Sequence, residues 1–142
     1  MSSGGEKSFV LFPLGGRRFA FPAEDVTELA KPDRLQIFPH RTAMLAGVLV
    51  RRGRIIPVLD VAQVLVGPEA PPRKFYLIVN RQCGLRQERM AIPVTGECEL
   101  ASAELFTSSG TMPDYAAGFL SLGDEVIEVV DLDKLVSEEA TA

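Results

Sequence analysis

The chain has 142 residues, of which 46% are hydrophobic and 24% charged, with a net charge of −4. This length fits one ordinary domain or two very small ones, and the composition excludes a fibrous or disordered chain. The acidity argues against nucleic acid as the main partner. Residues 1–71 nevertheless carry +2 (9 basic, 7 acidic) and residues 72–142 carry −6 (6 basic, 12 acidic). This asymmetry indicates either contact surfaces of unlike sign or merely solvated charge.

The sequence predicts a soluble, cytoplasmic protein with no metal or other cofactor. The longest apolar run, residues 44–50, is far shorter than the ~20 residues of a membrane span. Residues 1–8 are polar and lack the apolar core of a secretion signal. Cys83 and Cys98 do not form a C-x-x-C pair, and with His40 as the one histidine the chain cannot gather a zinc site.

An internal repeat appears when the chain is compared with itself at an offset of 71 residues. Residues 19–29 then match residues 90–100 at 4 of 11 positions, and residues 44–65 match residues 115–136 at 6 of 22 positions. Two separate blocks sharing one offset indicate a duplicated structural unit.

Each copy is predicted to contain a hairpin, an irregular stretch, a second pair of apolar strands and a short helix. Closely spaced strands and recurring turn residues favour small β-barrels over a doubly wound sheet. A unit of ~70 residues has a marginal core, so the two units should pack on each other. The predicted strands are 9–12, 19–22, 46–50 and 54–59 in copy one, and 75–79, 90–93, 117–122 and 125–130 in copy two. The residues expected to point into the barrels or their junction are Val48, Ile56, Val58, Phe119, Ile127 and Val129.

An aspartate stands at the start of each predicted helix. Asp60 has capping-box spacing to Gln63, and Asp131 occupies the matching place in copy two. Two equivalent carboxylates could also suggest acid–base catalysis. We favour structural caps, because aspartate is a preferred N-cap residue and no other catalytic group accompanies the pair.

Signatures of an active site are missing from the sequence. There is no phosphate-binding loop, dinucleotide fingerprint, H-E-x-x-H motif or nucleophile elbow. His40 lies in a polar loop without a nucleophile near it in the sequence, and Cys83, although close to Arg81 and Arg86, is interpreted as a plain loop thiol. We therefore predict a protein that is not an enzyme.

Residues 47–60 carry the most specific pattern, Gly-Val-Leu-Val-Arg-Arg-Gly-Arg-Ile-Ile-Pro-Val-Leu-Asp. This segment resembles the strand–turn–strand signature of the CheW-like domain family, Gly-Val-Ile-Asn-Leu-Arg-Gly-x-Ile-Ile-Pro-Val-x-Asp. Val50 replaces the usual Asn and Arg51 the usual Leu. The segment Phe-Ala-Phe-Pro at residues 19–22, followed by Val26, resembles an earlier part of the family pattern.

The resemblance implies an all-β fold of two SH3-like, five-stranded barrels around a shared core. It covers residues 8–138, with copies at about 9–66 and 75–137 whose barrels could exchange strands, and flexible tails at 1–7 and 139–142. It implies an adaptor that couples the cytoplasmic tip of a chemoreceptor to the regulatory domain of a CheA-type histidine kinase. No appended receiver or kinase segment is visible, so a stand-alone coupler without membrane insertion is expected.

The repeat points to a partner-binding turn. Copy one has Arg-Arg-Gly-Arg at residues 51–54, where copy two has Leu-Gly-Asp-Glu at 122–125. A turn needs glycine but not three arginines, so the excess charge suggests binding. For Arg51 and Arg54, charge that keeps the strand edge soluble explains the pattern equally well. Arg52 can make bidentate contacts with a carboxylate. The predicted partner-binding residues are Gly47, Val48, Val50, Arg51, Arg52, Gly53, Arg54 and Ile55.

Three other functions were weighed against the coupling adaptor. The first is a CheW-like scaffold in a motility or polarity assembly that has lost receptor or kinase contact, which the departures at Val50 and Arg51 would fit. The second is a nucleic-acid-binding barrel, disfavoured by the acidic charge and the lack of aromatic residues beside the arginines. The third is an enzyme, for which the sequence gives no support.

Overall fold

The computed structural model describes residues 5–31, 35–37, 45–67, 74–83, 85–107 and 112–135. His40, residues 1–4 of the first predicted tail, the whole second tail, and the side chains of Gln63 and Cys83 lie outside the described part. Within it, strands dominate, and no helix is long and apolar enough to cross a membrane. The strands are β1 (Lys7–Leu14), β2 (Arg17–Pro22), β3 (Val26–Ala30), β4 (Leu35–Ile37), β5 (Leu45–Arg51), β6 (Arg54–Leu59), β7 (Phe75–Cys83), β8 (Arg86–Val94), β9 (Glu99–Ala103), β10 (Ala116–Leu122) and β11 (Glu125–Val130). The labelled helices are a 3-10 turn η1 (Ala23–Asp25) and α1 (Ala62–Leu65), and residues 132–135 form a last helical turn.

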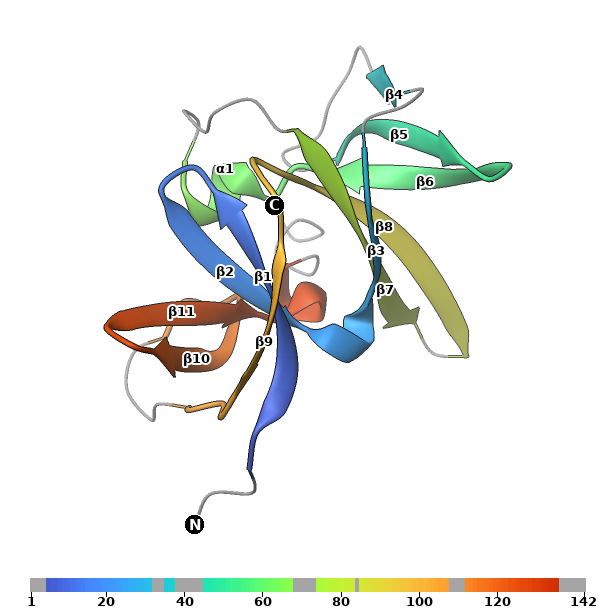
Figure 1. Ribbon diagram of the computed structural model, residues 1–142. Coiled ribbons are helices and arrows are strands. Elements are labelled where there is room, and N and C mark those ends of the chain that lie inside the picture. Colours follow the sequence, from blue (N-terminus) through green and yellow to red (C-terminus); the bar gives the residue numbers. More distant parts are fainter. Residues whose placement is uncertain are drawn as a thin grey trace.

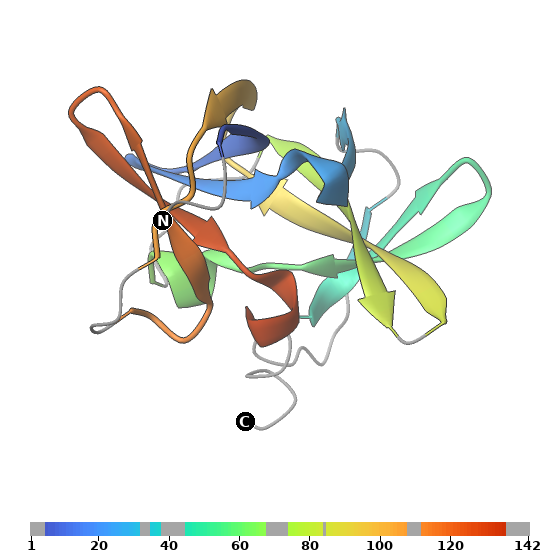
Figure 2. The ribbon, with the colours of Figure 1, turned by 90° about the horizontal axis from the view of Figure 1, so that it is seen from below.

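The strands form two sheets that exchange hairpins between the repeat copies (Figures 1 and 2). Sheet A has the order β10-β11-β2-β1-β9, and sheet B has the order β3-β7-β8-β6-β5-β4. The first hairpin of copy one, β1–β2, therefore completes the sheet of copy two, and β7–β8 completes that of copy one. The all-β, two-unit fold is as predicted.

Sheet B has one strand more than the five predicted for each barrel. Its extra strand, β4, pairs with β5 through Leu35↔Leu49, Gln36↔Val48 and Ile37↔Gly47. In sheet A the described residues of the corresponding segment make one bridge, Phe106↔Phe119. The part of the chain that the structure describes thus shows a short edge strand in sheet B where sheet A has one residue pair.

The strand registers repeat at the offset found in the sequence. A β-bulge lies between Leu45 and Gly47 in sheet B and between Ala116 and Gly118 in sheet A, 71 positions later. The parallel contacts agree as well, since Val58 pairs with Ala91 and Val129 pairs with Ala20. The two sheets are therefore built on one backbone pattern.

The core is divided into a large cluster shared by both sheets and a smaller one in each sheet. Alternation along a strand sends neighbouring residues to opposite sides. On β2, Phe19 and Phe21 enter the shared cluster while Ala20 enters that of sheet A. Their counterparts Met90, Ile92 and Ala91 on β8 follow the same division. Phe12 stacks on Phe21, with ring centroids 4.8 Å apart.

The predicted inward-facing residues are mostly, but not all, buried. Ile56, Val58, Ile127 and Val129 are buried. Val48 and Phe119 are only half-buried, which corrects the prediction for both. The reason is strand alternation: Gly47 and Leu49 take the inner face of β5, and Gly118 and Leu120 take that of β10.

Candidate functional site

The hairpin β5–β6 projects from one end of the molecule (Figure 1). Arg51 pairs with Arg54 as the last strand pair, so Arg52 and Gly53 form a two-residue loop. Both have positive φ, 53° and 75°, as a type I′ turn requires. Arg52 is the one described residue other than glycine with positive φ, a conformation that costs ~1–2 kcal/mol outside glycine. The side chain is 79% exposed and its guanidinium is presented to solvent.

A hollow of about 360 Å³ lies beside this loop, and we call it the arginine hollow. It is lined by Thr27, Glu28, Arg51, Arg52, Arg54, Ile56, Ile78 and Arg89. An adjoining hollow of about 220 Å³ shares Arg54, Ile56 and Arg89 and adds Ile55, Asn80 and Gln87. Each hollow combines two isoleucines with a mainly polar lining, which includes four arginines in the first and two in the second. This arrangement suits a partner that carries carboxylates.

Glu28 is the one carboxylate among the described residues that line the arginine hollow. Arg51 Nε donates a hydrogen bond to Glu28 Oε1, and Arg52 Nη2 lies 3.8 Å from Oε2. The hydrogen bond from Arg51 lowers the pKa of Glu28, partial burial opposes it, and the charges of Arg51, Arg52 and Arg89 lower it further. Within the described residues Arg54 and Arg89 form no ion pair, so the hollow keeps an excess of positive charge.

The predicted partner-binding residues divide into two groups. Arg51, Arg52, Gly53, Arg54 and Ile55 lie together at the exposed end of the hairpin, and Ile55 is 71% exposed. The other three lie further along β5, where Gly47 is buried and Val48 and Val50 are half-buried. These three residues therefore contribute more to packing within the sheet than to an exposed binding surface.

Sequence reasoning missed the two charged residues that other strands bring to this site, Glu28 and Arg89. Arg89 reaches the hollow because β8 runs parallel to β6, and Glu28 because β3 joins the same sheet through β7. The basic stretch from residue 80 to 89 was the available signal for Arg89. Nothing in the local sequence around Glu28 marks it as an arginine partner.

The equivalent place in sheet A has the opposite charge. Arg18, the counterpart of Arg89, donates to Glu125 through Nε at 3.2 Å and through Nη2 at 2.5 Å. Its Nη1 lies 3.4 Å from Glu99 Oε1. The hydrogen bond with Arg18 lowers the pKa of Glu125, and the same contact raises the pKa of Arg18.

The two predicted helix caps differ. Lys134 N–H donates to Asp131 Oδ1 at 3.2 Å, which is the contact expected of an N-cap. In copy one, α1 begins one residue later, so Val61 rather than Asp60 occupies the N-cap position, without a side-chain hydrogen bond there. The cap position predicted for Asp60 is therefore corrected: Asp60 precedes the cap and is buried, at 5% exposed.

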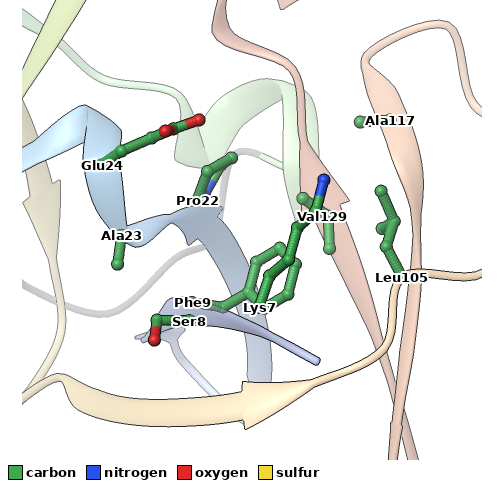
Figure 3. Close-up of a pocket in the computed structure, with 9 residues that line it drawn as sticks. All are labelled: Lys7, Ser8, Phe9, Pro22, Ala23, Glu24, Leu105, Ala117 and Val129. Atoms are coloured by element: carbon green, nitrogen blue, oxygen red, sulfur yellow. The ribbon is translucent and has the colours of Figure 1, made fainter. Parts of the chain in front are cut away.

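A third hollow, of about 410 Å³, opens between β1, η1 and the β10–β11 hairpin (Figure 3). Its walls are mainly apolar, with Lys7, Ser8 and Glu24 as the polar residues among those that line it. The described residues contain no group of three or more His, Cys, Asp or Glu side chains that could hold a metal ion. These features define a class of all-β protein built from two joined sheets, with an arginine-rich hollow at one exposed hairpin end.

The comparisons with known proteins agree with this class. The family model of the CheW-like domain matches residues 8–139, and the chain belongs to that family. It is 25% identical over 139 residues to a probable chemotaxis protein CheW of Rhizobium etli, covering 94% of this chain and 90% of the relative. It is 23% identical over 143 residues to the chemotaxis protein CheW of Klebsiella aerogenes, covering 96% of this chain and 85% of that relative.

Two further matches extend the comparison. Protein FrzA of Myxococcus xanthus is 34% identical over 65 residues, 46% of this chain and 41% of that protein. The crystal structure of the scaffolding protein TtCheW from Thermoanaerobacter tengcongensis matches with a TM-score of 0.71 at 18% identity. The match covers 93% of this chain and 88% of that one, so the two proteins share the fold. The family is one of non-enzymatic scaffold proteins, which confirms the prediction that the chain is not an enzyme.

Proposed function

We propose that this protein is a cytoplasmic signalling adaptor that couples a chemoreceptor to a CheA-type histidine kinase. Membership of the CheW-like domain family and the chemotaxis relatives support this proposal. The observation that carries it in the structure is the exposed Arg52–Gly53 loop above the arginine hollow. A strained, solvent-facing arginine at the tip of a strand pair is more easily explained by recognition than by folding.

The kinase regulatory domain is the partner we assign to the end of sheet B. Arg52 and Arg54 would set orientation through partner carboxylates, and Ile55 would supply apolar contact. Charged rims around apolar contacts are typical of regulated interfaces of modest size.

The receptor tip is the partner we assign to the junction of the two sheets. A hollow of about 270 Å³ is lined there by Asn80 and Arg81 from sheet B and by Pro22 and Val130 from sheet A. Arg81 spans it, with Nε 2.9 Å from Asp133 Oδ1. A receptor hairpin in this junction would contact both sheets at once.

The test is the affinity of Arg52→Asp for each purified partner from the same source, measured by calorimetry. We expect the kinase domain to bind more weakly by ~2 kcal/mol or more if the contact is desolvated, and receptor-tip binding to change little. Lys74→Glu, an exposed charge reversal away from the hairpin end, is the matched control. Wild-type affinity of a folded Arg52→Asp for the kinase domain would remove Arg52 from the site.

A second candidate is a CheW-like scaffold that serves a motility or polarity assembly instead. Arg51 favours it, because this residue replaces the usual leucine of the family pattern and is bound to Glu28 inside the hollow. Pull-downs with the kinase domain and the receptor tip separate the two candidates, since only the coupler retains both.

A further inference from the structure

The apolar cluster of sheet A reaches the surface at the third hollow, between β1, η1 and the β10–β11 hairpin (Figure 3). Phe9 and Val129 line the hollow and belong to this cluster, and Leu105 and Ala117 pack against the same cluster. The volume of about 410 Å³ is in the range of small-molecule sites, for which the mouth of a β-barrel is a common place. The hollow is therefore a candidate site for a small ligand with an apolar part.

Two opposite charges stand at the rim of this hollow. Strand alternation places Lys7 on the same face of β1 as Phe9, while Glu24 comes from η1. Figure 3 shows the two side chains reaching the hollow from these different elements. Both are exposed, and neither forms an ion pair with any residue in the described part of the chain. A ligand with a single charge would therefore meet one attraction and one repulsion here.

The corresponding place in sheet B is filled differently. Pro22 and Pro93 are 71 positions apart, and their strand partners Phe9 and Tyr76 therefore correspond to each other. The residues that correspond to Lys7, Ala23 and Glu24 are then, in this order, Lys74, Val94 and Thr95. A fully buried valine thus replaces the half-buried alanine of the hollow, and a neutral hydroxyl replaces its carboxylate. The duplicated fold does not demand this space or this pair of charges.

We propose that the third hollow binds a free α-amino acid with an apolar side chain. The α-carboxylate of the ligand lies beside Lys7, its α-ammonium group lies beside Glu24, and its side chain packs against the apolar wall. A zwitterion carries one charge of each sign on the same carbon, so both rim residues gain a partner and neither repels the ligand. Because both rim residues are exposed, each ionic contact contributes little, and burial of the apolar side chain provides most of the affinity. A ligand of this size is expected to have a dissociation constant on the order of 1 mM.

The test is titration of the isotope-labelled full chain with L-phenylalanine and with L-leucine, up to about 20 mM, followed by two-dimensional NMR. We expect saturable shifts of the amide signals of the residues that line the hollow. Three compounds each lack one part of phenylalanine: 3-phenylpropionate lacks the ammonium group, phenethylamine lacks the carboxylate, and glycine lacks the apolar side chain. The first two should bind at least about threefold more weakly than phenylalanine, and glycine at least about tenfold more weakly. The absence of saturable shifts with both amino acids, or equal binding of any of the three compounds, overturns the proposal.

Substitutions assign the two charges. Lys7→Gln should weaken binding of phenylalanine at least about threefold without weakening that of phenethylamine, and Glu24→Gln should do so without weakening that of 3-phenylpropionate. Lys74→Gln, at the counterpart of Lys7, and Glu97→Gln, at another exposed glutamate, are the matched controls and should bind as wild type. Ala23→Val introduces the larger residue of sheet B and should weaken binding of every ligand. Wild-type affinity of both charge variants, or equal losses in the controls, overturns the assignment. No receptor or kinase is present, so the result is independent of the proposed coupling function.

Discussion

Arg52 and Gly123 occupy the same position in the two repeated hairpins, and both have positive φ, 53° and 59°. Glycine adopts this conformation without steric penalty, whereas arginine does not. We therefore expect Arg52→Gly to raise the free energy of unfolding by up to ~1 kcal/mol while it weakens partner binding. Urea unfolding checks the first effect. Arg52→Ala is the control, since it removes the charge but keeps the strained backbone; a Gly variant no more stable than the Ala variant contradicts the strain.

Gly118 is packed too tightly to carry a side chain. A Cβ atom there would lie 2.5 Å from the Phe106 carbonyl oxygen and 2.8 Å from Leu105 Cδ1. Gly118→Ala should therefore lower the free energy of unfolding by ~1–3 kcal/mol. The comparison is Gly16→Ala, because a Cβ at Gly16 meets nothing within 4 Å. Equal stability of the two variants in urea unfolding would show that the bridge between Phe106 and Phe119 yields easily.

Glu28 should make stability fall in acid. Its pKa lies below the usual 4.5, chiefly because of the hydrogen bond from Arg51, so the ionised form is favoured in the folded state. The resulting stabilisation is complete above the usual pKa and is lost as the pH falls through the lowered folded value. Glu28→Gln should be less stable than wild type at neutral pH, with the difference shrinking in acid. Unfolding experiments at a series of pH values measure this stability difference, and Glu97→Gln, at an exposed position, is the control. A difference that grows in acid would contradict the lowered pKa of Glu28.

Asp25 should behave in the opposite way. Burial raises its pKa above the usual 3.8, and the nearby carboxylates of Glu24, Asp133 and Asp131 raise it further. The charged form present at neutral pH is therefore unfavourable to folding, and the penalty disappears as the pH falls below 3.8. Asp25→Asn should be more stable than wild type at neutral pH and equal to it in acid. Thermal melts across this range give the answer, and a destabilised variant at neutral pH would refute it.

Asp131 supports the last helical turn through its contact with the Lys134 N–H. Asp131→Ala should cost ~1 kcal/mol of stability and leave binding of the kinase regulatory domain nearly unchanged. Asp114→Ala, at an exposed position in the preceding turn, should change stability little. A marked loss of affinity at full stability would place Asp131 at the interface instead.

Local pattern was enough to predict the repeat, the charged hairpin and eight of the eleven strands, while β3, β4 and β9 lie in stretches for which no strand was predicted. Alternation and turn residues are properties of neighbours in the chain, so the pair Arg52 and Gly53 could be placed at a hairpin tip from sequence. The facing of Val48 was misjudged because the bulge between Leu45 and Gly47 and the inward glycine leave Leu49 to fill the core.

Long-range pairing could not be predicted in the same way. Glu28 and Arg89 are 61 residues apart and meet in one hollow only because β7–β8 inserts between β3 and β6. The choice of partner strands depends on the complete core, in which Phe19 and Phe21 and their counterparts Met90 and Ile92 share one cluster. No window of sequence contains that information.

The exchange of hairpins also sets the order in which the newly synthesised chain can mature on the ribosome. β1–β2 is made first, yet three of the five strands of its sheet are β9, β10 and β11, and the last of these ends at Val130. All strands of sheet B have been synthesised once β8 ends at Val94. Sheet B can therefore form before sheet A, although sheet A contains the first hairpin of the chain. Until β9, β10 and β11 have been synthesised, the β1–β2 hairpin exposes Phe9 and Leu11, which are buried in the finished protein. A nascent chain that stalls between these points would present a ready-made strand edge to a neighbouring copy.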